Sequence, residues 1–95
     1  MKTFNVNSTS LDVTFDCVEC GVRVEAELTE IPRPNMLAEH IHDSESSEEE
    51  FIECECGHQY TAHIYVNQAE GNLEIEDSDA ARLIPDGNIQ IEENY

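Results

Sequence analysis

Four cysteines in two short pairs are the residues of this chain whose type and spacing point most directly to chemistry. The first pair lies in Cys17-Val18-Glu19-Cys20-Gly21, and the second lies in Cys54-Glu55-Cys56-Gly57. Two thiolates so close together can hold one metal ion, and the glycine after each pair can adopt the positive φ that turns backbone N–H groups toward the sulfurs. Because the chain has no other cysteine, the two pairs predict a single site of four thiolates.

Disulfide bonds are the alternative use of these cysteines, and two observations disfavour them. A bridge between Cys54 and Cys56 would close a very small, strained ring. The chain begins Met1-Lys2-Thr3-Phe4-Asn5, with no apolar signal segment, so we expect a cytoplasmic compartment in which thiols stay reduced. No stretch approaches the apolar length of a membrane span, and we expect no membrane association.

The size of the chain also favours a structural metal. Residues 1–95 are predicted to form one domain, close to the lower limit at which a hydrophobic core is sufficient alone. Large core side chains are scarce, since there is no Trp and there are only three Phe and three Tyr. Bound zinc can contribute roughly 10 kcal/mol or more to folding, which would supply the missing stability.

Apolar and polar residues alternate beside each cysteine pair, as they do in half-buried β-strands. Residues 11–16 and 22–29 flank the first pair, so we expect a hairpin whose turn is the pair itself. Phe51 and Ile52 precede the second pair, and residues 60–66 alternate after it. The predicted fold class is mostly β, a small antiparallel domain with one acidic, solvent-facing side.

The remaining segments predict less regular structure. Two more strands are expected at 73–76 and 89–92, each after a turn that contains glycine. One or two short helical turns are expected, at 34–41 and at 77–84. The acidic, low-complexity segment 43–50 predicts a mobile loop between the two hairpins.

Two cysteine knuckles on neighbouring hairpins resemble the zinc-ribbon family, and the resemblance covers residues 11 to 67. It implies a β domain built around one structural Zn²⁺, with Gly21 and Gly57 as the knuckle glycines. A shell closed by four protein ligands leaves no open position for catalysis, so a structural role is indicated. The implied ligands are Cys17, Cys20, Cys54 and Cys56.

The second pair departs from the family pattern because it has one intervening residue in place of two. His58, two residues past Cys56, is therefore a candidate substitute ligand. The alternative, which we favour, is that His58 is an exposed polar residue at the tip of the knuckle. Iron is the alternative metal, since rubredoxin-like proteins are also small, acidic and built on two such knuckles. This chain lacks their proline in the second knuckle and has no Trp, which favours zinc.

The charge of the chain is its second strong signal. Twenty-two acidic residues against four basic ones give a net charge of −18, which should repel DNA, RNA and anionic lipid and attract a basic protein. We expect the acids of the predicted strands and of the acidic segment to form successive rows across one sheet face. The candidate contact residues are Asp43, Glu45, Glu48, Glu49 and Glu50, followed by Glu25, Glu27, Glu74 and Glu76.

No catalytic arrangement or phosphate-binding loop is present in the sequence, and His40 and His42 fit a polar segment better than a second metal site. We therefore expect a non-enzymatic, zinc-stabilised β module that binds and inhibits a basic partner, as an antitoxin, immunity protein or DNA mimic would. The partner would be a nuclease, a toxin or another nucleic-acid-binding protein. Two alternatives stay open: a rubredoxin-like iron electron carrier and a purely structural subunit of a complex.

Overall fold

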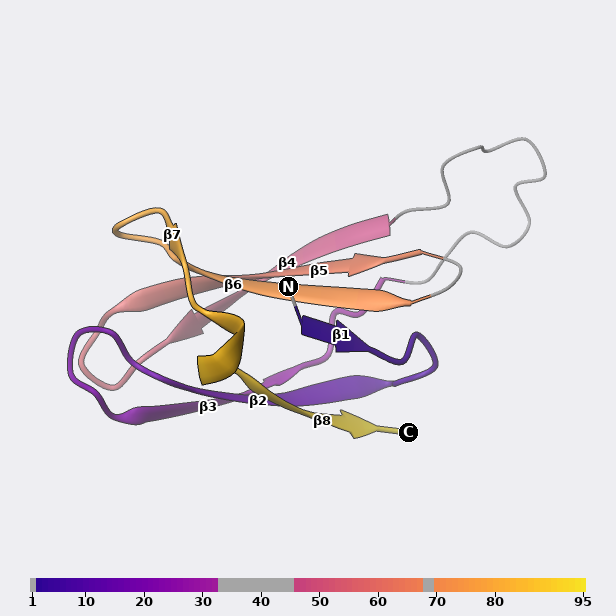
Figure 1. Cartoon of the computed structure of the whole chain (residues 1–95), viewed down its shortest axis with the longest axis horizontal. Helices are drawn as coiled ribbons and strands as arrows, with labels where there is room; N and C mark the ends of the chain where they lie inside the picture. Colours follow the sequence, from indigo (N-terminus) through magenta and orange to yellow (C-terminus); the bar gives the residue numbers. More distant parts are fainter. Residues whose placement is uncertain (1, 33–45, 68–69) are drawn as a thin grey trace.

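Two antiparallel β-sheets face each other across one hydrophobic core (Figure 1). The computed structural model describes residues 2–32, 46–67 and 70–95. The chain is mostly β, as its alternating pattern predicts, and each sheet contains one of the two hairpins that carry the cysteine pairs. Both cysteine turns lie at the same end of the molecule, on the left in Figure 1.

Five strands form the first sheet: β1 (Lys2–Phe4), β4 (Ser46–Glu53), β5 (Gln59–Val66), β6 (Gly71–Asp77) and β7 (Arg82–Leu83). Strands β5 and β6 lie at its centre, and β4 forms one edge. The other side of β6 is shared, because β1 pairs with its first residues and β7 with its last two.

Three strands form the second sheet, in the order β3 (Arg23–Leu28), β2 (Ser10–Asp16) and β8 (Gln90–Asn94). Strand β2 is therefore the central strand, with an antiparallel neighbour on each side. A 3₁₀ turn, η1 (Asp86–Asn88), comes directly before β8 and is the one helical turn in the described residues.

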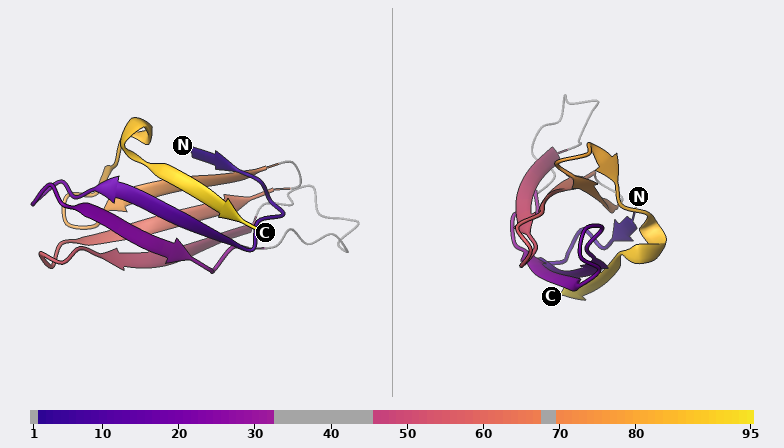
Figure 2. Two further views of the ribbon diagram at one scale, coloured as in Figure 1. Left: turned by 90° about the horizontal axis from the view of Figure 1, so that it is seen from below. Right: turned by 90° about the vertical axis from the view of Figure 1, so that its left-hand side faces the viewer.

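The side chains that point inward are those that the alternating pattern predicts. Leu11, Val13 and Phe15 of β2 are buried, and so are Tyr60 and Ile64 of β5. Seen end-on, the strands surround this core (Figure 2). The rings of Phe15 and Tyr60 meet edge to face with their centroids 4.8 Å apart, so an aromatic pair joins the two sheets near the cysteine turns.

The prediction of a mobile loop over 43–50 is wrong for residues 46–50, which form the first part of β4. Glu48, Glu49 and Glu50 lie opposite residues of β5, and this pairing supplies the backbone hydrogen bonds that a loop would lack. An edge strand tolerates so many charges because their carboxylates can reach water. Residues 43–45 and the helical turn predicted at 34–41, with His40 and His42, lie outside the described residues.

The helical turn predicted at 77–84 is also wrong. Asp77 ends β6, and its Oδ1 accepts hydrogen bonds from the backbone N–H groups of Asp79 (3.1 Å) and Ala80 (3.3 Å). An aspartate that accepts hydrogen bonds from the two or three residues after it favours a tight turn, and the chain then enters β7. In the described part of the chain, no helix has the length and apolar character needed to cross a membrane.

Candidate metal centre

Each cysteine pair lies in the turn of a hairpin, and the two turns are built alike. The backbone N–H of Cys17 donates to the carbonyl of Val22 (2.9 Å), and the N–H of Gly21 donates to the carbonyl of Cys17 (3.0 Å). Corresponding hydrogen bonds form around Cys54 and Gly57, at 2.9 and 2.8 Å. Both glycines have a positive φ, 73° and 92°, so the expectation that they permit the turn is confirmed.

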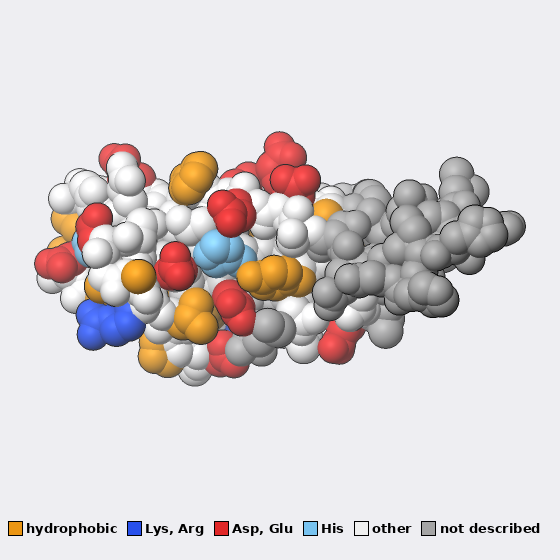
Figure 3. All heavy atoms as spheres, turned by 90° about the horizontal axis from the view of Figure 1, so that it is seen from above, with side chains coloured by type: hydrophobic (Ala, Val, Ile, Leu, Met, Phe, Trp, Pro, Cys, Tyr) orange, Lys and Arg blue, Asp and Glu red, His pale blue; other side chains and the backbone are white. Residues whose placement is uncertain are grey.

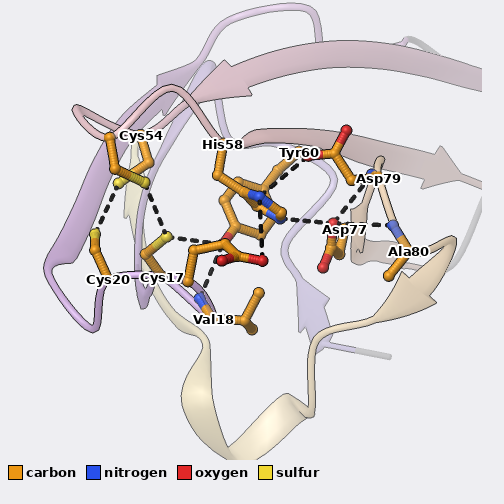
Figure 4. A network of polar contacts seen from close by, with 11 residues as sticks. Cys17, Val18, Cys20, Cys54, His58, Tyr60, Asp77, Asp79 and Ala80 are labelled. Carbon is orange, nitrogen blue, oxygen red and sulfur yellow. Dashed lines mark hydrogen bonds and ion pairs between the residues drawn. The ribbon is translucent and has the colours of Figure 1, made fainter.

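The four cysteine sulfurs come together between the two turns (Figure 4). All four Sγ atoms lie within 4.8 Å of one another; the sulfurs of Cys20 and Cys54 are 3.5 Å apart, and those of Cys17 and Cys56 are 3.8 Å apart. Four sulfurs at about 2.3 Å from one zinc ion, placed at the corners of a tetrahedron, are about 3.8 Å from each other. The donor set therefore fits one metal ion and is compatible with a zinc-ribbon-like site.

The site is buried on one side and open on the other. Cys17 and Cys54 are buried, whereas Cys20 and Cys56 are exposed, and all four are free thiols. Each pair thus contributes one buried and one exposed sulfur. The first cysteine of each pair continues the series of inward-facing side chains from the strand before it, and the second cysteine lies in the turn. The short spacing of the second pair does not prevent its two sulfurs from reaching the common site.

The two inner thiols differ in acidity. Burial alone would raise the pKa of Cys17, but hydrogen bonds from the Tyr60 hydroxyl and from the backbone of the turn lower it to about 6. The backbone N–H of Cys56 lowers the pKa of Cys54, but burial and the neighbouring thiols raise it to about 12. Of these two, Cys17 is therefore the more acidic thiol.

Tyr60 contacts the cysteine site directly, although the alternating pattern of its strand predicts only a core position. Its hydroxyl donates a hydrogen bond to Sγ of Cys17 (3.2 Å) and accepts one from the backbone N–H of Val18 (2.9 Å). A tyrosine among inward-facing apolar residues was a usable signal, since a buried hydroxyl needs a partner. Its position six residues after Cys54 places that partner near the cysteine turns.

His58 is buried, so the expectation of an exposed residue at the tip of the knuckle is wrong. Its Nε2 lies 2.7 Å from Oδ1 of the buried Asp77, and its Nδ1 lies 3.1 Å from Oδ2 of Asp79 and 3.9 Å from Oε1 of Glu19 (Figure 4). Burial alone would lower the pKa of His58, but the hydrogen bond with Asp77 and the nearby carboxylates raise it. Both ring nitrogens therefore face carboxylates, and His58 groups with two aspartates, separately from the four cysteines.

The acids expected to share one sheet face are divided between the two sheets. Glu25 and Glu27 are exposed on β3 of the second sheet, whereas Glu74 and Glu76 are half-buried on the outer side of β6 in the first. The expectation of successive rows across one face is therefore wrong, because β3, directly after the first cysteine pair, belongs to the second sheet, whereas β6 belongs to the first.

The acidic side chains of β4 lie on both faces of the first sheet, because successive side chains of a strand point to opposite sides. Glu49 points outward, and its Oε1 lies 3.5 Å from Nδ1 of His63 on β5. Figure 3 shows this outer face, where acidic side chains lie among hydrophobic ones and a histidine. Glu48 is exposed, and Glu50 is half-buried, with an Oε2 that is buried and has no described hydrogen-bond partner. Asp43 and Glu45 lie outside the described residues.

The second sheet carries an acidic row that the sequence did not reveal. Asp12 of β2 lies directly opposite Glu27 on one side and Glu92 on the other. Each of these acids occupies a polar position in an alternating strand, but their alignment depends on the strand order and register. The row therefore becomes visible only in the folded structure.

The fold and the site together define a small antiparallel β protein with a four-cysteine cluster at one end. Neither a protein-family model, nor a curated protein, nor a solved structure matches the chain.

Proposed function

We propose that this chain is a non-enzymatic, zinc-stabilised β module that binds a basic protein through the outer face of its second sheet. The observation that carries the proposal is the position of Asp12 between Glu27 and Glu92. Like charges directly opposite each other in a sheet are destabilising, and such cross-strand pairs are worth about 0.2–1 kcal/mol each. A row of three carboxylates therefore favours the approach of cationic groups.

The chain itself compensates little of this charge. His58 and His63 form ion pairs with nearby acids, and neither histidine lies in the second sheet. Asp12 accepts one hydrogen bond, from Nδ2 of Asn94 at 3.2 Å. On the first sheet, by contrast, His63 lies between Glu49 and a carboxylate of β6. More negative charge is thus left for a partner on the second sheet.

The shape of this face also suits a cationic side chain. A shallow depression of about 360 Å³ lies over the row. Its acidic lining comes from all three strands of the sheet, so a Lys or Arg side chain that enters it can approach several carboxylates. The acidic residues that line the depression are Asp12, Glu25, Glu27 and Glu92.

The partner that we propose is a nuclease, a toxin or another nucleic-acid-binding protein. The basic groove of such a protein is already complementary to a row of anionic groups, so an antitoxin, immunity protein or DNA mimic inhibits by occupying it. The net charge of −18 supports this class of partner over nucleic acid or anionic lipid, both of which it repels.

The experiment is a pull-down from native lysate at low salt, followed by binding kinetics with the basic protein that it identifies. The test variant combines Asp12→Asn, Glu27→Gln and Glu92→Gln. The matched control combines Glu49→Gln, Glu74→Gln and Glu76→Gln, which removes the same charge from the other sheet. We expect the test variant to slow association by about tenfold or more and the control to have a smaller effect.

Two results would contradict this assignment. If both triple variants slow association equally, the net charge of the chain matters and the second sheet is no docking surface. If binding of the wild-type chain stays tight in molar salt, the interface is not electrostatic, and the chain is better described as a structural subunit of a complex.

Zinc is the ion that we propose for the four cysteines, because tetrahedral thiolate coordination is typical of structural zinc. Iron is the second candidate, and the exposure of Cys20 and Cys56 favours it, since an electron carrier needs its metal near the surface. Metal analysis and a visible spectrum of the purified protein separate the two. We expect one zinc ion per chain and a colourless protein. A coloured protein with one iron ion per chain would instead indicate an electron carrier.

A further inference from the structure

We infer that Tyr60 is a positioning residue of the metal centre, whose hydroxyl holds the sulfur of Cys17 in the orientation that metal binding requires. The inference rests on the proposed metal site and adds a residue that is not itself a ligand. It begins from two hydrogen bonds, Tyr60 hydroxyl to Cys17 Sγ at 3.2 Å and Val18 N–H to the Tyr60 oxygen at 2.9 Å.

The direction of these bonds fixes the role of the hydroxyl. A backbone N–H can only donate, so the Tyr60 oxygen is the acceptor of the bond from Val18. The single hydroxyl proton is then free to point at the sulfur of Cys17. This hydrogen bond restrains the direction in which the Cys17 sulfur points within the cluster of four.

The ring of Tyr60 is held in place from both sides. It is fully buried, and its centroid lies 4.8 Å from that of Phe15 and 5.0 Å from that of His58, both in edge-to-face contact. Because the ring cannot swing away, the hydroxyl is a fixed donor. Figure 4 shows the side chain of Tyr60 between the cysteine sulfurs and Asp77.

The contact also crosses between the two hairpins. Tyr60 lies on β5, directly after the second cysteine turn, whereas Cys17 and Val18 belong to the first turn. The hydroxyl therefore ties the two halves of the site together independently of any ion. Residues that hydrogen-bond to metal ligands in this way typically change metal affinity by about 10- to 100-fold when they are removed.

The test compares Tyr60→Phe with Tyr65→Phe, using Co²⁺ as a spectroscopic probe and chelator competition for zinc affinity. Tyr65 is a matched control because it lies on the same strand, on the outer face, where its ring stacks with that of His63. We expect Tyr60→Phe to weaken zinc binding by about 10- to 100-fold. We also expect its thiolate-to-cobalt charge-transfer band to move to longer wavelength, because a thiolate without its hydrogen bond gives up electron density more easily. Tyr65→Phe should change neither quantity.

Each other outcome overturns a different statement. If the wild-type chain binds neither Co²⁺ nor Zn²⁺ tightly, the proposed metal site itself fails. If Tyr60→Phe binds like the wild type, or binds more weakly with an unchanged charge-transfer band, the hydroxyl only supports packing and the positioning role fails. A Tyr60→Phe chain that stays unfolded in saturating zinc likewise assigns Tyr60 a purely structural role.

Discussion

The imidazole Nε2 of His58 lies 2.7 Å from Oδ1 of Asp77, and the two side chains are buried together beside the second cysteine turn. The same carboxylate accepts backbone hydrogen bonds from Asp79 and Ala80. Burial alone would raise the pKa of Asp77, but these hydrogen bonds and the contact with His58 lower it. One ionised aspartate therefore joins the second knuckle, the end of β6 and the turn that follows.

Replacing this carboxylate should be costly, whereas replacing its neighbour should not. We expect Asp77→Asn to lower the melting temperature of the zinc-loaded protein clearly more than Asp79→Asn does. The reason is that Asp77 is buried with several partners, whereas the side chain of Asp79 is 69% exposed. Thermal unfolding of both variants in excess zinc measures the difference. If both substitutions lower the melting temperature equally, the pair of His58 and Asp77 contributes no more to stability than a surface contact does.

Removing the metal should unfold the protein or leave it only marginally stable. Structural zinc contributes on the order of 10 kcal/mol of binding free energy to small domains, and this chain has a modest core. We expect a strong chelator to abolish the cooperative unfolding transition and zinc to restore it, as followed by circular dichroism.

Single substitutions test which residues hold the ion. Cys20→Ser and Cys56→Ser should each weaken zinc binding strongly although both residues are exposed, because each leaves only three sulfurs. His58→Ala should still bind one zinc ion per chain, since its ring nitrogens face carboxylates. Metal analysis after dialysis gives the stoichiometry. Loss of zinc from His58→Ala, with zinc retained by Cys56→Ser, would make His58 the fourth ligand.

The sequence was sufficient to predict what local patterns control. The alternation around Cys17 and Cys54 predicted the two hairpins, and the glycine after each pair predicted the positive φ of its turn. The sequence could not predict the environment of His58, because its partner Asp77 comes from another strand, 19 residues further along the chain. Burial of a polar residue depends on such distant partners, and no local pattern encodes them.

Strand pairing explains the other differences. The register that aligns Asp12 with Glu27 and Glu92 depends on which strands become neighbours, and β2 and β8 are neighbours despite the long segment between them. Likewise, the acidic residues 46–50 have the composition of a loop but form an edge strand, because β5 provides their hydrogen-bond partners. In both cases the tertiary context outweighs the local preference.

Glu50 should make the stability of the protein fall as the pH rises. Burial, with the charges of Glu30 and Glu27, raises the pKa of Glu50, although the N–H of Thr29 opposes this. A carboxyl with a higher pKa in the folded state binds more protons when folded. It therefore lowers the free energy of unfolding as the pH rises from the ordinary value of 4.5 through the raised one.

Glu50→Gln should consequently be more stable than the wild type at pH 7, and the difference should shrink toward pH 4.5. Urea unfolding across this range measures it, with Glu48→Gln, an exposed position of the same strand, as the control. A Glu50→Gln chain that is less stable than the wild type at pH 7 would show that the ionised carboxylate of Glu50 stabilises the folded protein.

The acidic row of the second sheet should also affect the stability of the chain in the absence of a partner. Asp12→Asn removes the central charge between Glu27 and Glu92, so we expect it to raise the free energy of unfolding by about 0.2–1 kcal/mol at low salt. Added salt screens the repulsion, and the gain should disappear near 1 M NaCl. Denaturant unfolding at several salt concentrations measures both effects. A gain that persists in high salt would have a cause other than charge, and a loss of stability at low salt would mean that the hydrogen bond from Asn94 outweighs the repulsion.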